Sequence, residues 1–182
     1  MKKLFLLLTL SIFVLSCDKS SENIYSKNIQ DTFFGVKFGA NKDIVIEVFE
    51  KEGILLEHGE YSTNIQTLRF TPKGEYISFC GMNWDYISCR FSSDDKFFGI
   101  QFVNTSKNIE TALKKFDSVF LELSSRHKMF AHPIEDENIY KHYGAVSKDK
   151  KRVQVVCQKV ESFLTTFYNV NLTYGDISKA KR

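Results

Sequence analysis

The stretch Trp84–Val103, WDYISCRFSSDDKFFGIQFV, decides the fold because two alternating segments flank a polar turn. Apolar residues recur at every second position on both sides of the turn, which is the period of a half-buried strand. A single antiparallel register buries all of them, and a slip of one residue would expose them. This register pairs the following residues: Phe91 with Phe98, Cys89 with Ile100, and Ile87 with Phe102. The stretch therefore predicts a hairpin with one apolar face.

The opposite side of this hairpin predicts a candidate binding face. It carries Trp84, Tyr86 and Arg90, and Tyr76 falls on the matching side of the preceding strand-like segment Tyr76–Cys80. Aromatic and arginine side chains on an uncovered sheet face suit recognition of a protein, peptide or glycan. The alternative is that the C-terminal strands or a loop pack over these residues, since half-buried aromatic residues are common in sheets.

Two helices are expected from apolar residues at spacings of three and four. The first begins after Asn41, a plausible cap, and ends at Gly53; the second covers about Lys107–Arg126, with Ser106 or Asn108 as its cap. Short alternating segments precede, separate and follow them. The pattern predicts an α+β fold: an antiparallel sheet of about six to eight strands, as a meander and hairpins, with two helices on one face.

The last three strands are expected at residues 139–146, 152–160 and 163–174. A two-residue turn at Glu161-Ser162 would place Val160 opposite Phe163 and Cys157 opposite Thr166. One face of this hairpin is then apolar apart from Thr166. The other face carries the following polar residues: Arg152, Gln154, Gln158, Asn169 and Asn171.

The first seventeen residues indicate where in the cell the protein is directed. Lys2 and Lys3 precede an apolar run, Leu4–Leu15, of about 12 residues, which is shorter than the roughly 20 of a spanning helix. Val14-Leu15-Ser16-Cys17 resembles the lipobox of bacterial lipoproteins. The resemblance implies diacylglycerylation of Cys17, cleavage before it and anchoring in a membrane. The alternatives are an ordinary secretory signal with an incidental Cys and a retained transmembrane anchor.

The chain is accordingly divided into four parts. Residues 1–16 are the signal peptide, 17–32 the lipidated Cys and a flexible tether, 33–175 a single α+β domain and 176–182 a basic tail. Asp18 after the lipidated Cys is compatible with retention at the inner membrane and with export to the cell surface. The expected location is the cell envelope, on its periplasmic side or at the cell surface.

Charge and residue types argue against several classes of function. The formal charge is +3, and removal of Lys2 and Lys3 leaves 23 basic against 22 acidic residues, or +1. A nucleic-acid-binding protein would normally show a basic face, so no nucleic acid is expected. No P-loop, GxGxxG, GxSxG or HExxH motif occurs, and no cofactor or metal is expected.

The three cysteines after Cys17 are expected to be free thiols. Cys80 and Cys89 fall on opposite faces of their strands, which aims their Cβ atoms apart. A bulge at Gly81 would be needed to pair them. Cys157 points to the same core as Cys89, but no pairing follows from that.

The segment Phe34–Lys42, leading into a helix that ends at Gly53, resembles the opening of small bacterial lipoprotein domains, most of them uncharacterised. The stretch from Gly81 to Phe102 resembles their central hairpin. A fainter likeness is to the helix-then-sheet modules of BamE and β-lactamase inhibitor proteins, which have glycines where Gly39 and Gly53 stand here. This chain departs from those modules by having one long helix after the sheet, and no functional residue carries over.

The sequence thus predicts a membrane-anchored extracytoplasmic lipoprotein whose domain is a non-enzymatic binding module. One alternative is a small-ligand-binding envelope protein with a pocket between the sheet and the long helix. The other is an envelope hydrolase with a site in the loop His127–Asp136, where His127 and His132 lie near Glu135 and Asp136.

Overall fold

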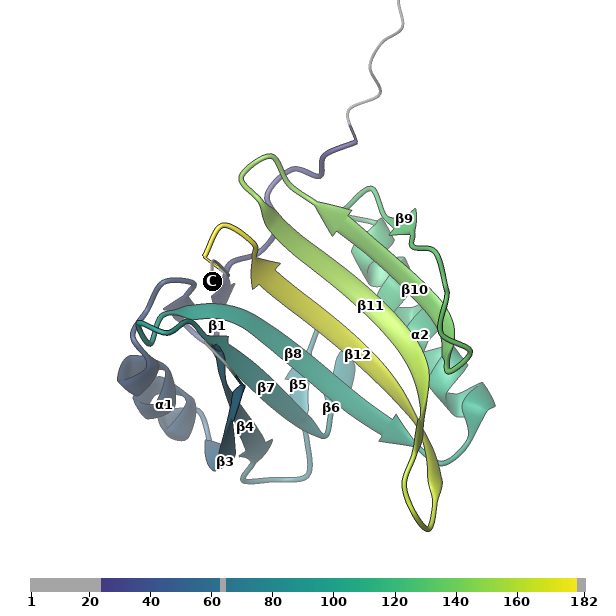
Figure 1. Cartoon of the computed structure of the whole chain (residues 1–182), viewed down its shortest axis with the longest axis horizontal. Coiled ribbons are helices and arrows are strands. Elements are labelled where there is room, and N and C mark those ends of the chain that lie inside the picture. The colour runs from purple at the N-terminus through teal and green to yellow at the C-terminus, as the bar shows by residue number, and fades with distance from the viewer. Residues whose placement is uncertain (1–23, 63–64, 180–182) are drawn as a thin grey trace, which may run out of the picture.

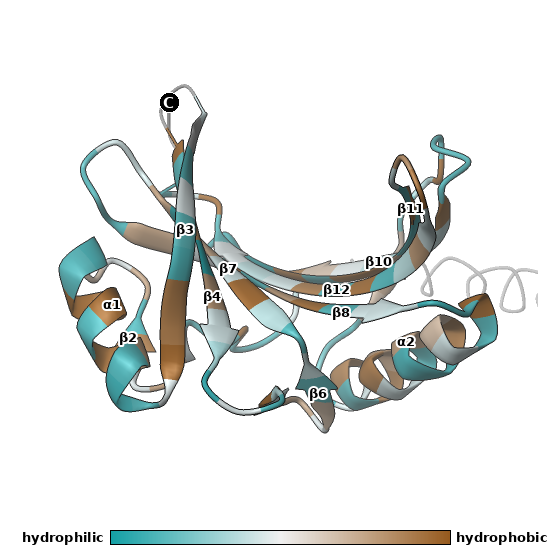
Figure 2. Cartoon of the chain, turned by 90° about the horizontal axis from the view of Figure 1, so that it is seen from below, coloured by the Kyte–Doolittle hydropathy of each residue, from teal (hydrophilic) through white to brown (hydrophobic). Residues whose placement is uncertain are grey.

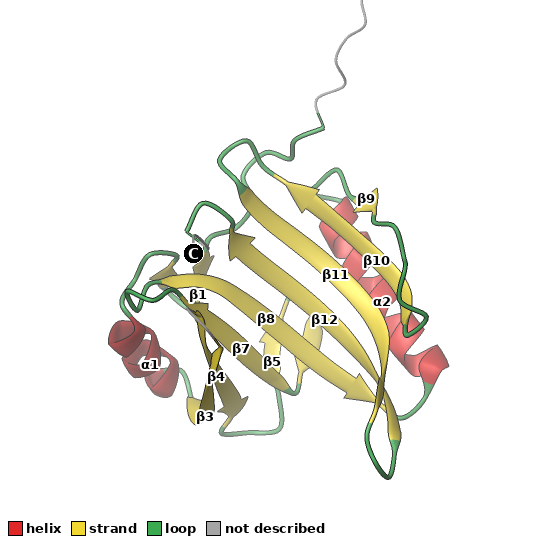
Figure 3. Cartoon of the chain, in the orientation of Figure 1, coloured by secondary structure: helices red, strands yellow, loops and turns green. Residues whose placement is uncertain are grey.

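The computed structural model describes residues 24–62 and 65–179. Two helices and twelve strands are formed by these residues (Figures 1 and 3). The elements are β1 (Thr32–Phe33), β2 (Val36–Lys37), α1 (Lys42–Lys51), β3 (Ile54–Ser62), β4 (Ile65–Pro72), β5 (Ile77–Phe79), β6 (Met82–Trp84), β7 (Tyr86–Phe91), β8 (Phe97–Ser106), α2 (Ile109–Ser124), β9 (Phe130–Ala131), β10 (Ile139–Val146), β11 (Lys151–Glu161) and β12 (Thr166–Asp176).

Eight of these strands form one antiparallel sheet in the order β3-β4-β7-β8-β12-β11-β10-β9. The last strand of the chain, β12, lies between β8 and β11, so it joins the early meander to the C-terminal hairpin (Figure 1). The prediction of an α+β fold built on an antiparallel sheet is confirmed.

Both helices lie on the same side of the sheet, and the sheet curves away from them into a trough (Figure 2). Phe49 of α1 packs edge-on against Phe70 of β4, with ring centroids 5.2 Å apart. The buried stripe of α2, which includes Phe116 and Val119, lies under β8, β12 and β11. Burial of these apolar side chains is the main force that holds the helices to the sheet.

Two small hairpins complete this covered side. The β1–β2 pair brings Phe33 against Phe38, and β5–β6 brings Phe79 under β8, where it stacks on Phe102 at 4.3 Å. Trp84, at the end of β6, has no exposed surface and donates its indole N–H to the carbonyl of Phe79 at 2.9 Å. Most of the buried aromatic side chains thus gather on one side of the large sheet.

The central register matches its prediction closely. Cys89 lies opposite Ile100 and Ile87 opposite Phe102, but Phe91 pairs with Phe97 instead of Phe98 because the ladder shifts at a bulge after Arg90. In the C-terminal hairpin the predicted register is wrong by four residues. Val160 pairs with Phe167, and the turn spans residues 162–165. A shift of four is an even number, so the residues that lie in β11 and β12 keep their predicted faces. Phe163, predicted to open the last strand, lies in the turn and is fully exposed.

The two helix caps differ. Asn108 caps α2, because its Oδ1 accepts hydrogen bonds from the backbone N–H groups of Glu110 at 2.7 Å and Thr111 at 3.2 Å. Asn41 makes no side-chain cap for α1; its Oδ1 accepts from Lys96 Nζ instead. Asn41 thus stands at the predicted N-cap position of α1, but its side chain does not cap the helix.

The domain begins earlier than expected, since residues 24–32 pack on it. Ser26 donates its backbone N–H to Val146 O at 2.9 Å, Ile29 is buried, and Asp31 pairs with Lys151 at 2.7 Å. These residues belong to the predicted tether, which is shortened accordingly. The signal peptide, Cys17 and the rest of the tether up to residue 23 lie outside the described residues, as do 180–182 of the predicted tail.

Candidate binding face

The side of the sheet away from the helices is called the open face. Strand alternation and register place these residues on it: Tyr86, Ser88 and Arg90 of β7; Gly99, Gln101, Val103 and Thr105 of β8; Asn169, Asn171, Thr173 and Gly175 of β12; Arg152, Gln154, Val156 and Gln158 of β11; and His142 and Gly144 of β10. Amides and hydroxyls dominate this set, and it contains no carboxylate. The part of the open face formed by β7, β8, β12, β11 and β10 is therefore polar and locally positive.

The centre of the open face is recessed. Asn171 and Thr173 are only 5% and 4% exposed, although neither helix lies on their side of the sheet (Figure 2). The curvature of the trough lets neighbouring side chains shield them. Of the two, Thr173 lines a pocket on this face, where a small ligand would contact it.

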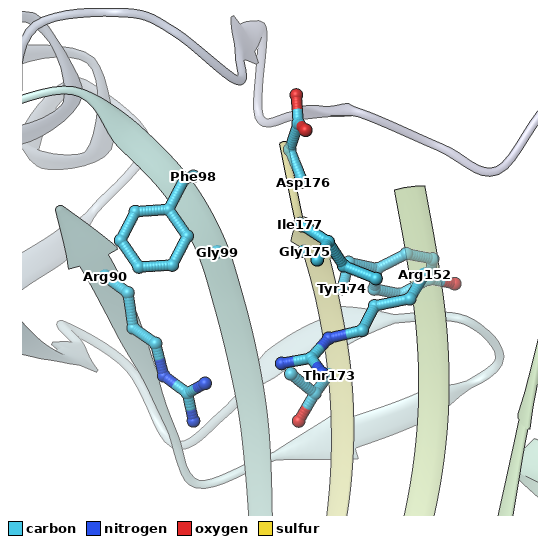
Figure 4. A pocket seen from close by; sticks show the side chains of 9 residues that line it. All are labelled: Arg90, Phe98, Gly99, Arg152, Thr173, Tyr174, Gly175, Asp176 and Ile177. Carbon is cyan, nitrogen blue, oxygen red and sulfur yellow. The ribbon is translucent and has the colours of Figure 1, made fainter. Parts of the chain in front are cut away.

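One row across four strands has an unusual composition. Arg90 on β7 lies opposite Gly99 on β8, Gly99 opposite Gly175 on β12, and Gly175 opposite Arg152 on β11. The two glycines leave the middle of the row without side chains. The result is a pocket of about 120 Å³ that has an arginine at either end and also touches Phe98, Thr173, Tyr174, Asp176 and Ile177 (Figure 4).

The two arginines have no counter-charge within the described part of the chain. Neither guanidinium makes an ion pair or a hydrogen bond there, and Arg152 Nε is buried without a partner. Burial lowers the pKa of Arg90, and the charge of Arg152 lowers it further. Asp176 lines the same pocket but points away from both arginines, and its carboxylate accepts from Ser178 N at 3.0 Å (Figure 4).

Arg69 and Tyr86, at the β4–β7 end of the open face, show the contrasting case of a neutralised arginine. Arg69 Nε lies 2.8 Å from Glu57 Oε2, and its guanidinium carbon lies 3.7 Å from the centre of the Tyr86 ring. A shallow pocket of about 150 Å³ beside them is lined by His58 and Glu60 among others. This end of the face thus carries its own acid, unlike the Arg90–Arg152 row.

At the opposite side a second pocket, of about 250 Å³, adjoins the arginine row. Arg152 and Ile177 line both pockets, and the larger one is otherwise mainly apolar, with Phe130 and Val146 among its walls. His132 also lines it and stacks on His142, with ring centroids 4.3 Å apart. Burial, and the neighbouring His132, lower the pKa of His142, although a hydrogen bond with Gln154 acts against this shift.

The structure separates the four predicted face residues. Tyr86 and Arg90 lie on the open face, but Trp84 lies in the core on the covered side, so its assignment to this face is wrong. The reason is that β6 ends at Trp84 and turns away to pair with β5, so the alternation of β7 does not continue into it. Tyr76 is 50% exposed and lines a different pocket at the end of α1.

Sequence reasoning missed Arg152, Gly99, Gly175 and Thr173 as partners of Arg90. It placed Arg152 on the polar side of the C-terminal hairpin and Arg90 on the polar side of the central one. No local pattern shows that β8 and β12 pair, and only that pairing brings the two polar sides together.

The histidines and cysteines weighed for other kinds of site lie apart from one another in most cases. His127 is half-buried with Nδ1 unpartnered, while His132 lies on the open side against His142. Within residues 24–62 and 65–179, no three His, Cys, Asp or Glu side chains gather as metal ligands. Cys80, Cys89 and Cys157 are free thiols in the same part of the chain. Burial raises the pKa of Cys89 well above its ordinary value and raises that of Cys157 to about 11.

No helix in the described part of the chain is both long and apolar enough to cross a membrane. No protein-family model matches the chain, and neither a curated protein nor a solved structure is significantly similar to it.

Proposed function

We propose that this protein is a membrane-anchored extracytoplasmic lipoprotein whose domain binds a ligand or envelope component through the open face. The observation that supports this best is the uncovered, recessed polar side of β7, β8, β12 and β11, with two arginines that lack a counter-charge in the described residues. A surface that served stability alone would gain nothing from two adjacent, unneutralised guanidinium groups.

The proposal of a membrane anchor rests on the predicted signal peptide and Cys17. Cys17 follows a short apolar run and a small residue, the order that a lipobox requires. Metabolic labelling with an alkyne-bearing fatty acid tests it in bacterial cells that process lipoproteins. The expected result is labelling of the wild type and loss of labelling in Cys17→Ser. Equal labelling of both would place the lipid elsewhere and end the proposal for Cys17.

The proposal that the open face binds a ligand is tested by site-specific cross-linking. A photoreactive residue is placed at Gln101 or Gln154 on the open face, and at Lys114 on the exposed side of α2. Cross-links in whole cells are expected at Gln101 and Gln154, weakened by Arg152→Gln, and absent at Lys114. Cross-linking of equal yield at all three positions, unaffected by Arg152→Gln, would refute the open face as the binding surface.

Small-ligand binding is the second candidate, because two pockets adjoin at Arg152. Their location differs from the one predicted between the sheet and α2, since they lie on the side away from the helix. The predicted hydrolase site in the loop 127–136 stays a prediction.

A further inference from the structure

The row Arg90–Gly99–Gly175–Arg152 has the geometry of an anion cradle. Three interstrand steps of about 4.8 Å separate the Cα atoms of the two arginines by about 14 Å. Each side chain extends inward from its end of the row. Figure 4 shows Arg152 reaching across β12 and Arg90 lying beside β8, on the same side of the sheet.

The glycines leave the space beneath the two arginine side chains open. A Cβ at Gly99 would lie 3.6 Å from both Cβ and Cδ of Arg90, and a Cβ at Gly175 would lie 3.6 Å from Nε of Arg152. Each arginine therefore lies directly over the glycine beside it. Neither glycine has a positive φ, so the backbone does not require glycine here. The absence of a side chain serves to keep the floor of the pocket clear.

The positive charge of the two arginines favours a phosphate monoester over a carboxylate as the bound anion. Two guanidinium groups share the pocket, and the carboxylate that also lines it, that of Asp176, points away from them and accepts a hydrogen bond from Ser178 N. A carboxylate would neutralise one of the two positive charges. A phosphate monoester carries close to two negative charges at neutral pH and three acceptor oxygens. Guanidinium groups match such oxygens with paired N–H donors, and the buried Nε of Arg152 is one donor that still needs an acceptor.

We propose that Arg90 and Arg152 bind the phosphate group of a phosphate monoester, whose apolar or aromatic substituent occupies the neighbouring pocket. This inference rests on the proposed binding role of the open face and specifies its ligand. The substituent is placed by the larger pocket, which shares Arg152 and Ile177 with the phosphate site and has Phe130 and the stacked His132 on its walls.

The test is a titration of the ¹⁵N-labelled full chain in non-ionic detergent, followed through its backbone amide signals. The probes are inorganic phosphate, phenyl phosphate and acetate, each at matched ionic strength. Saturable shifts are expected at Gly99, Thr173 and Gly175 with phosphate, tighter binding with phenyl phosphate, and shifts extending to Ala145 and Gln154 with phenyl phosphate only. Acetate is expected to bind weakly.

Three variants test whether the amide shifts arise from binding between Arg90 and Arg152. Arg90→Gln and Arg152→Gln are each expected to weaken phenyl phosphate binding at least about tenfold, since a hydrogen bond to a charged group is lost. Gly175→Ala keeps both arginines and fits without backbone strain, but narrows the floor, so it is expected to weaken binding as well. Lys114→Gln removes the same charge from the helical side of the molecule and is expected to leave binding unchanged.

Several outcomes would overturn the proposal. Shifts that follow ionic strength alone, or unchanged binding in both arginine variants, would eliminate the phosphate site. Acetate binding as tight as phosphate would assign the site to carboxylates instead. Phenyl phosphate binding no tighter than phosphate would remove the second pocket from the site. If phosphate fails while the cross-links at Gln101 and Gln154 persist, the ligand assignment falls and the binding face stands.

Discussion

The two faces of the large sheet are built from the same strands but have opposite chemistry. On the covered face, Cys89, Ile100 and Val153 are fully buried beneath helices and aromatic hairpins. On the open face, their immediate neighbours Arg90, Gly99 and Arg152 form a hollow with unneutralised charge. Because successive residues of a strand point to opposite sides, one face can stabilise the fold while the other is free for recognition. Stability and binding can therefore be tested one residue apart.

The largest expected difference lies between Phe102 and Gln101. Phe102 has no exposed surface and contacts the rings of Phe33, Phe79 and Trp84. Truncation to Ala should lower the free energy of unfolding by about 3–5 kcal/mol. Gln101→Ala, on the same strand but the open face, should change it by no more than about 0.5 kcal/mol.

Urea-induced unfolding followed by tryptophan fluorescence measures both variants, since the buried Trp84 is the single Trp of the chain. A loss of similar size in both would mean that the open face also contributes to the core. The contrast between the two faces would then be wrong.

A smaller effect is expected for Lys151, which precedes Arg152 and points to the other side. Its Nζ lies 2.7 Å from Asp31 and 2.9 Å from Asp149. Lys151→Gln should lower the free energy of unfolding by up to about 1 kcal/mol, because these pairs are partly exposed. Arg152→Gln, one residue later, should not lower it.

The ion pair between Asp31 and Lys151 should make the stability of the fold depend on pH. Burial tends to raise the pKa of Asp31, but the hydrogen bond and charge of Lys151 outweigh it, so that the pKa falls below its ordinary value of 3.8. A carboxyl whose folded pKa is lowered contributes its full stability above the unfolded pKa, and the contribution is lost as the pH falls through the folded pKa. Asp31→Asn should thus be less stable than wild type at pH 6, and the difference should disappear as the pH falls through the folded pKa of Asp31, which lies below 3.8. A pH-independent difference in chemical denaturation would argue against the ion pair.

The smallest effect on stability is expected at Arg90. Removing its charge relieves repulsion from Arg152 and breaks no ion pair within the described residues. Arg90→Gln should leave the free energy of unfolding unchanged or raise it by a few tenths of a kcal/mol, as expected for a residue kept for binding. Low salt is the sensitive condition, since screening is then weakest. A loss above about 1 kcal/mol would give Arg90 a structural role and weaken the contrast.

Local sequence patterns predicted what local forces determine. Alternation of Ile87 and Cys89 against Ile100 and Phe102 was sufficient to place the central register, and a continuous apolar stripe was sufficient for α2. The strand β3 was missed because its residues, Ile54–Ser62, mix apolar and charged side chains without clear alternation. Its partner β4 and the helix α1 hold it in place instead.

The candidate site was predicted only in part, for a related reason. Arg90 was placed on the polar face of its hairpin, but its partner Arg152 comes from a strand 62 positions later. Their proximity depends on insertion of β12 between β8 and β11, a tertiary choice that no short pattern records. The assumed two-residue turn at Glu161-Ser162 failed because the chain uses the longer loop 162–165.

The central claim, that the open face binds through its arginine pair, is tested most directly by thermal unfolding of the full chain in phenyl phosphate against chloride at equal ionic strength. A ligand that binds only the folded state at ten times its Kd should raise the midpoint of wild type by about 3–6 °C. The Arg90→Gln/Arg152→Gln double variant should show no phosphate-specific rise. The same rise in both proteins, or no rise in wild type, would contradict the account.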